Sequence, residues 1–176
     1  MISIFVWWIG EATVDQELLE HVRLHLAAAF GRPVFLWESP ERPRHAYDEK
    51  RKQWRTAPIL KWLLEQGPGA GKVLGITDQD LFIPILTYVF GEAQLGGEAA
   101  VVSMARLGGG EGDGRELLVE RLAKEAVHEV GHAFGLVHCG HAHCVMSRSP
   151  AVREVDEKAG LCADCRAHLE ELCQGA

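Results

Sequence analysis

Apolar residues are clustered along the chain in short runs that are rich in β-branched and aromatic side chains, the composition typical of buried strands. The first run is ISIFVWWI at residues 2–9, and KVLGIT at residues 72–77 is another. None is long enough to cross a bilayer as a helix, which needs about 20 apolar residues. On this pattern we expect strands over residues 2–9, 33–37, 72–77, 85–90 and 99–107.

Apolar residues at helical spacing predict helices over residues 16–30 and 57–66, and a longer one that ends at Phe134. Thr13 or Asp15 can cap the first helix. In the longest helix, a projection at about 100° per residue places the apolar side chains on one side and His128 and His132 on the other. The apolar side is formed by Val119, Leu122, Ala123, Ala126, Val127, Val130, Ala133 and Phe134.

The connecting segments are rich in glycine, proline and charge, which favours turns and loops. Residues 38–54 are interpreted as a charged connection without an assigned role, and residues 67–71 (GPGAG) as a turn. This turn lacks the Lys-Ser/Thr ending of a phosphate-binding loop. We expect Asp78 and Asp80 to hold a turn by accepting hydrogen bonds from backbone amides.

The composition is that of one globular domain. The chain has 176 residues, of which 47% are hydrophobic and 24% charged. Its net charge of −7 argues against nucleic acid or an anionic membrane as a partner. Residues 1–9 lack the positive flank and cleavage site of a secretory signal. All five cysteines follow residue 138, and four are spaced as metal ligands rather than as a disulfide framework, so we expect a cytoplasmic protein.

The densest chemistry lies in HEVGHAFGLVH, residues 128–138. His128 and His132 are four residues apart and can bind one metal ion from the same face of a helix. Gly135 can end that helix in the left-handed conformation, so that the chain turns back and brings His138 to the same ion. Three imidazoles leave one tetrahedral position open, as in catalytic zinc sites, and Glu129 is then placed to act as a general base.

A second metal set follows directly. Cys139, Cys144, Cys162 and Cys165 have the spacing of a four-thiolate zinc site, in which no position is left for water. We therefore expect this ion to be structural. Neighbouring side chains in an extended segment point to opposite sides, so His138 and its neighbour can serve different ions. The expected cofactors are two Zn²⁺ ions per chain.

The run from His128 to Met146, together with the later CADC at residues 162–165, resembles the archaemetzincins of the metzincin clan. The family continues from its third histidine into a cysteine, four residues, another cysteine, one residue and a methionine, then a distant C-x-x-C. Every one of these elements is present here. One departure is Arg148, because many metzincins have a tyrosine two residues beyond the methionine.

The resemblance implies an α+β, metzincin-like fold. Its sheet has about four to five mostly parallel strands with an antiparallel edge strand, and the C-terminal helical part is held by the four-cysteine zinc site. It divides the single domain into residues 1–135, with the active-site helix, and residues 136–176. Met146 would form an apolar platform beneath the three imidazoles. The strand before the active-site helix would lie at the sheet edge and bind substrate as an added strand, through Ala99, Ala100, Val101, Val102, Ser103 and Met104.

Together these observations predict a zinc metallopeptidase that hydrolyses peptide bonds by Glu129-assisted attack of a zinc-bound water, with a peptide or protein as its partner. Two alternatives remain: a binding or regulatory module that keeps its metals for folding, and a three-histidine zinc endoribonuclease. Glu129 and the net negative charge of the chain argue against the nuclease. His21 and His25 mimic a ligand pair but have no third ligand nearby in the sequence, so we interpret them as ordinary helix residues. Substrate specificity and oligomeric state are not predicted.

Overall fold

A computed structural model describes residues 2–38, 41–108 and 112–174. Its centre is a five-stranded sheet in the order β2-β1-β5-β8-β7. All pairs in it are parallel except β7 with β8, so the sheet has the expected mostly parallel strands and one antiparallel edge. The strands are β1 (Ile4–Trp8), β2 (Val34–Trp37), β5 (Lys72–Thr77), β7 (Gly91–Ala93) and β8 (Ala99–Ser103).

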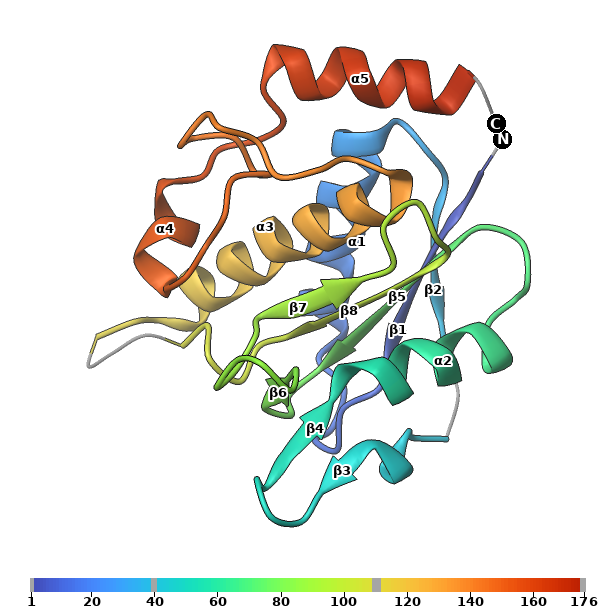
Figure 1. Ribbon diagram of the computed structural model, residues 1–176, viewed down its shortest axis with the longest axis vertical. Helices are drawn as coiled ribbons and strands as arrows, with labels where there is room; N and C mark the ends of the chain where they lie inside the picture. Colours follow the sequence, from blue (N-terminus) through green and yellow to red (C-terminus); the bar gives the residue numbers. More distant parts are fainter. Residues whose placement is uncertain (1, 39–40, 109–111, 175–176) are drawn as a thin grey trace.

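Helices cover both faces of this sheet (Figure 1). Helices α1 (Gln16–Phe30) and α3 (Arg115–Phe134) pack against each other and against one face, and α2 (Thr56–Gln66) covers the other. The alternation of side chains along each strand divides the core accordingly. On β1, Ile4, Val6 and Trp8 join the core under α1 and α3, whereas Trp7 joins the core under α2. The apolar side of α3 is buried there as the sequence pattern predicts.

The C-terminal segment crosses over α3 and ends in two helices, α4 (Val152–Glu157) and α5 (Ala163–Gln174). In Figure 1 it forms the orange and red part that lies over α3. The expected division of the chain at residue 135 stays a prediction. No helix in residues 2–38, 41–108 and 112–174 combines the length and the apolar character needed to span a bilayer.

Several boundaries of the sequence prediction are wrong. Residues 85–90 form no strand but an irregular segment, in which Ile85 is 86% exposed, Val89 makes only an isolated bridge to Leu81, and Phe90 is buried. Residues 38–54, expected as a connection, contain part of a second sheet. That sheet has the order β3-β4-β6, with a 3₁₀ turn (Arg44–Ala46) before it, and its strands are β3 (Tyr47–Asp48), β4 (Gln53–Arg55) and β6 (Leu81–Phe82).

The caps and turns were predicted better. The Asp15 side chain accepts the backbone N–H of Leu18 and so caps α1. The Asp78 carboxylate accepts the backbone N–H groups of Glu11 and Ala12, each at 2.9 Å, and holds the loop between β1 and α1. Asp80 differs from the prediction, because its carboxylate pairs with side chains, those of Gln53 and Arg106.

Candidate active site and metal centres

Three imidazoles converge at the end of α3. His128 and His132 lie one turn apart, with their Nε2 atoms 3.1 Å from each other. Gly135 then takes a left-handed conformation, with φ 106°, and its N–H is donated back to the carbonyls of Gly131 and His132. The chain reverses, and the ring of His138 comes to 4.8 Å from that of His132. Ligand nitrogens of all three lie within 4.8 Å of one another.

The backbone fixes which nitrogen each buried histidine turns toward this point. His128 Nδ1 lies 2.7 Å from the Val145 carbonyl, and His132 Nδ1 lies 2.7 Å from the Leu136 carbonyl. Each Nδ1 therefore carries the proton and donates it, and each Nε2 is left with a lone pair. Two lone pairs at 3.1 Å repel each other unless a cation lies between them, so this donor set fits a metal ion.

Burial favours the neutral form that metal binding needs. The pKa of His128 is lowered well below its usual value, first by burial and then by the nearby Lys158 ammonium. The pKa values of His132 and His138 are also lowered, again mainly by burial. Arg148 lies beside the third imidazole, with its Nε 3.3 Å from His138 Nδ1. It occupies the position where many metzincins have a tyrosine.

Glu129 is buried beside the three histidines, with an exposure of 5%. Its pKa is raised well above the usual value, first by burial and then by the Glu125 carboxylate, while Lys158 acts in the opposite direction. Edge strand β7 passes directly over it. A Cβ atom placed on Gly91 would come within 2.6 Å of Glu129 Cγ, so only glycine lets the strand approach the carboxylate this closely.

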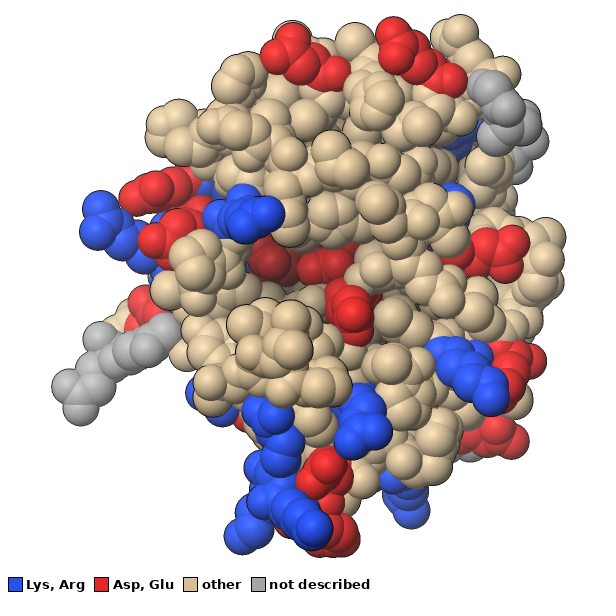
Figure 2. Space-filling view, viewed as in Figure 1, with Lys and Arg blue, Asp and Glu red and all other residues tan. Residues whose placement is uncertain are grey.

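These groups line a cleft of about 660 Å³. Figure 2 shows this face of the molecule hollowed at its centre, with acidic side chains on the floor of the hollow. One wall is the irregular segment 86–91, and the other is formed by residues 148–150. His128, Glu129 and His138 are exposed to the cleft together, so a molecule that enters it meets the carboxylate and the imidazoles at once.

The methionine after the third histidine is fully buried under the same helix. Met146 has an exposure of 0%, and its Sδ lies so close to Gly131 that a Cβ there would come within 2.5 Å. Its carbonyl accepts the N–H of Cys139 at 2.9 Å. The methionine therefore packs against α3 next to His132, and its role as a platform stays a prediction.

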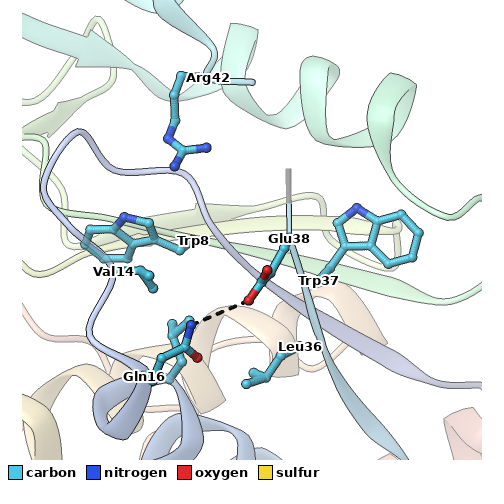
Figure 3. A pocket seen from close by; sticks show the side chains of 8 residues that line it. Trp8, Val14, Gln16, Leu36, Trp37, Glu38 and Arg42 are labelled. Atoms are coloured by element: carbon cyan, nitrogen blue, oxygen red, sulfur yellow. Dashed lines mark hydrogen bonds between the residues drawn. The ribbon is translucent and has the colours of Figure 1, made fainter. Parts of the chain in front are cut away.

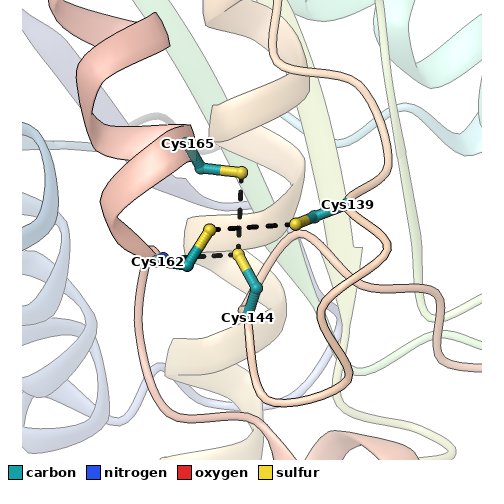
Figure 4. A group of neighbouring side chains, drawn as sticks. All are labelled: Cys139, Cys144, Cys162 and Cys165. Atoms are coloured by element: carbon teal, nitrogen blue, oxygen red, sulfur yellow. Dashed lines mark hydrogen bonds between the residues drawn. The ribbon is translucent and has the colours of Figure 1, made fainter.

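The four expected cysteines come together between the loop after His138 and the start of α5, with their sulfurs within 4.8 Å of one another (Figure 4). Cys139 and Cys162 have sulfurs 3.8 Å apart, and Cys144 and Cys165 have sulfurs 3.7 Å apart. All four are free thiols. Around a zinc ion with Zn–S bonds of about 2.3 Å, the edge of a tetrahedron is about 3.8 Å, so the spacing fits a four-thiolate site. A backbone N–H bond from Cys165 is the main cause that lowers the pKa of Cys162 to about 6.

The predicted substrate strand is misplaced. Ala99, Ala100, Val101, Val102 and Ser103 form β8, which lies inside the sheet, hydrogen-bonded to β5 on one side and to β7 on the other. Met104 follows directly after it. Because both edges of β8 are paired and its side chains are buried, it has no free edge for a peptide. The edge strand on this side of the sheet is β7, which the sequence analysis did not predict.

Sequence reasoning missed a buried ion pair beneath the histidines. Lys158 Nζ lies 2.9 Å from Glu125 Oε1 and 3.4 Å from His128 Nδ1, and both charged side chains are buried. Glu125 is three residues before His128 on the same helix, which could have suggested a supporting role. Nothing in the sequence indicates Lys158, because it reaches the site only through the fold of the C-terminal segment.

A second cavity, of about 530 Å³, shares no lining residue with the cleft. It lies between the ends of β1 and β2 and the start of α1, with Trp8, Leu36 and Trp37 among its walls (Figure 3). Its polar groups are partly paired, since the Gln16 side chain donates to Glu38 at 3.5 Å. It is lined by neither a histidine nor a cysteine, so it contains none of the metal ligands predicted from the sequence.

Comparison with known proteins gives a consistent result. Residues 69–171 match the profile of the family described as Peptidase family M54. The archaemetzincin of Haloarcula marismortui is 39% identical over 170 residues, which cover 92% of this chain and 95% of that protein. The crystal structure of archaemetzincin from Methanopyrus kandleri superposes with a TM-score of 0.84 at 33% identity, covering 98% of this chain and 96% of that one. The archaemetzincin from Archaeoglobus fulgidus, crystallised with malonate, gives 0.81 at 34% identity, covering 94% and 99%.

Proposed function

The chain belongs to peptidase family M54, the archaemetzincins, and is therefore a zinc metallopeptidase that acts on peptides or proteins; we propose that it cleaves them with Glu129 as the general base beside a zinc ion on His128, His132 and His138. The observation that carries this proposal is the convergence of three imidazoles beside a buried carboxylate, with His128, His138 and Glu129 lining one cleft. A zinc ion held by these three histidines would supply a Lewis acid, which would polarise the scissile carbonyl and make a water molecule more acidic.

The residues of the chain perform the proton transfers. Glu129 accepts a proton from the attacking water and returns it to the leaving amine. Burial raises its pKa and so makes the carboxylate a stronger base, while a bound cation nearby acts in the opposite direction. The bonds from Nδ1 to the carbonyls of Val145 and Leu136 hold the first two imidazoles in place.

Strand β7 is the part of the sheet that supports peptide binding. It pairs only with β8 among the described residues, so its other edge is open to an extended chain. A peptide hydrogen-bonded along Gly91–Ala93 would pass next to Glu129, because Gly91 lies against that side chain. We therefore assign to β7 the role that the sequence had suggested for β8.

The cysteine cluster is proposed to hold a second, structural zinc ion. Four sulfurs complete a tetrahedral shell and leave no position for substrate or water. The cluster joins the loop that carries His138 to the start of α5, and so it fixes the position of the third histidine.

The test is the isosteric substitution Glu129→Gln in zinc-loaded protein. A positioned acid/base contributes about 10²- to 10⁴-fold, so we expect hydrolysis of a peptide library, followed by mass spectrometry, to fall by that factor while the zinc content stays unchanged. Glu116→Gln, an exposed carboxylate in the first turn of the same helix, should have no effect. Equal cleavage by Glu129→Gln and the parent protein would exclude this mechanism. Absence of cleavage by the zinc-loaded parent would favour the metal-stabilised binding module instead.

A further inference from the structure

A third group of metal-ligating side chains lies between α1 and α3, away from the cleft. His21 and His25 are one turn apart on α1, and the structure places Glu120 of α3 against both rings. This third partner could not be predicted from the sequence, because Glu120 is 99 residues from His21. The three ligand atoms lie within 4.8 Å of one another.

The spacing of these atoms is that of a coordination shell. Glu120 Oε2 lies 3.4 Å from His21 Nε2 and 3.6 Å from His25 Nε2. Both distances are longer than the usual 2.7–3.2 Å of a nitrogen–oxygen hydrogen bond. With metal–ligand bonds of about 2.0–2.2 Å, the edge of a tetrahedron is about 3.3–3.6 Å, which agrees with both contacts.

The orientation of the rings supports the same interpretation. His25 Nδ1 lies 3.0 Å from the backbone carbonyl of His21, so it carries the proton and leaves the Nε2 lone pair directed toward Glu120. Both imidazoles face the same carboxylate oxygen, and their ring centroids are only 4.2 Å apart. Two protonated rings at this distance would repel each other, whereas one divalent cation satisfies both lone pairs and the carboxylate.

We propose that His21, His25 and Glu120 form a third metal site, which takes a divalent transition ion of the zinc type and links α1 to the active-site helix. Two imidazoles and one carboxylate suit Zn²⁺, Ni²⁺ or Cu²⁺ and not Mg²⁺ or Ca²⁺, which require oxygen ligands. The side chains are about 40% exposed, so the ion exchanges with solvent. The site lies two turns before His128 on α3, and binding there stabilises the packing of α3 on α1 without entering the cleft.

The experiment measures zinc binding by isothermal titration in the parent and three variants, with the tighter sites of each protein already loaded. The parent should bind one further equivalent, and both His25→Gln and Glu120→Gln should lose it. His168→Gln removes a comparable exposed histidine that has a single carboxylate neighbour, Glu171, and should behave as the parent does. Mg²⁺ at the same concentration should give no signal in any of them.

Thermal unfolding provides an independent readout. At free zinc of about 100 times the dissociation constant, the melting temperature of the parent should rise by roughly 5–10 °C, and that of the two variants should not change. Because only differences between parent and variants are counted, the result does not depend on the number of zinc ions elsewhere or on activity. The same stoichiometry and the same shift in the parent, His25→Gln and Glu120→Gln would overturn the proposal.

Discussion

The histidine centre and the cysteine centre differ in how their ligands are held. Two ligands of the histidine centre come from α3, a helix packed in the core, and their imidazoles are fixed by backbone carbonyls. All four ligands of the cysteine centre come from the C-terminal segment, which has little regular structure between α3 and α4. The first centre leaves an open side toward a cleft, and the second is surrounded by its own sulfurs.

We propose that this difference reflects separate roles, in which a metal ion bound by the cysteine centre would position the histidine centre. Three consecutive residues connect the two centres. Cys144 contributes a sulfur to the cysteine centre, and the carbonyl of the next residue, Val145, accepts a hydrogen bond from His128. Met146 then packs under α3. His138 and Cys139 are adjacent and belong to different centres. The loop that carries these residues has internal hydrogen bonds, among them the one from the Cys139 N–H to the Met146 carbonyl at 2.9 Å. We propose that a metal ion on the four sulfurs ties this loop further to α5.

The largest expected effect comes from Cys144→Ser, because Cys144 is the most deeply buried of the four ligands. Opening the shell should release the structural zinc and cost more than about 4 kcal/mol, a large part of the 5–15 kcal/mol of a typical domain. Hydrolysis should fall with it, since His138 loses its support. Zinc content by atomic absorption and unfolding by calorimetry measure both effects.

The matched control is Cys173→Ser, which changes the fifth cysteine, a partly buried residue of α5 outside the cluster. It should keep its full zinc content. If Cys144→Ser also kept two zinc ions and the parent's melting temperature, the cysteine centre would not be the element that positions the histidines.

The second prediction concerns Lys158, which belongs to the C-terminal segment but supports the histidine centre. Lys158→Met leaves the Glu125 carboxylate buried without its partner, and removing one member of a buried pair costs about 3–5 kcal/mol. Denaturant unfolding in the presence of zinc measures the loss. The double variant Glu125→Gln with Lys158→Met removes both charges and should recover much of the stability. A single variant as stable as the parent would show that the pair is solvated in solution.

How much of this could be predicted from the sequence depends on how local each feature is. His128, Glu129, His132 and Gly135 lie within eight residues on one helix and its cap, so the geometry of an α-helix was enough to bring them together. The spacing of the four cysteines in the sequence likewise predicted that they form one site. Lys158 and Glu120 could not be assigned, because their neighbours are 30 to 100 residues away and only the tertiary fold supplies them.

The sheet edge was missed for a different reason. Gly91, Glu92 and Ala93 have low intrinsic strand propensity, and β7 forms because β8 offers it a partner. The apolar segment before it looked more like a strand but lines the cleft. Strand assignment from composition fails where pairing, and not the side chains, determines the conformation.

The third prediction tests how closely the edge strand approaches the histidine centre. Gly91→Ala adds a methyl group within 2.6 Å of Glu129 Cγ and of the Val101 carbonyl. A displacement of about 1 Å at a catalytic group costs on the order of 10²-fold in rate, so kcat should fall by about that factor, with zinc content unchanged and a stability loss of about 1–3 kcal/mol. The control is Gly140→Ala, between Cys139 and Cys144, because a Cβ atom added there meets only open space. Full activity of Gly91→Ala would show that β7 does not determine the position of the Glu129 carboxylate.

The smallest expected effect concerns the contact between the C-terminal segment and α3 that Asp156 of α4 makes with Arg121. The two side chains form paired hydrogen bonds of 2.7 and 2.8 Å, and the Arg121 bond is the main cause that lowers the pKa of Asp156. A carboxyl group whose pKa is lower in the folded state contributes stability above its unfolded value of about 3.9, and this contribution is lost as the pH falls through the folded pKa. Asp156 is 38% exposed, so solvent screens the pair and Asp156→Asn should cost only about 0.5–1 kcal/mol at pH 7.

The difference between Asp156→Asn and the parent should begin to shrink below about pH 4, where Asp156 becomes neutral in the unfolded state, and should reach zero only below the lowered pKa of the folded state. Unfolding is followed in both proteins under identical metal conditions, so protonation of the zinc ligands affects the two alike and cancels in the difference. Glu157→Gln, the next residue of the same helix, removes a carboxylate whose ion pair is with the exposed Arg153, and it should change stability by less than about 0.5 kcal/mol at any pH. A pH-independent difference for Asp156→Asn would mean that the loss comes from packing, and that charge contributes nothing to the junction between α3 and the C-terminal segment.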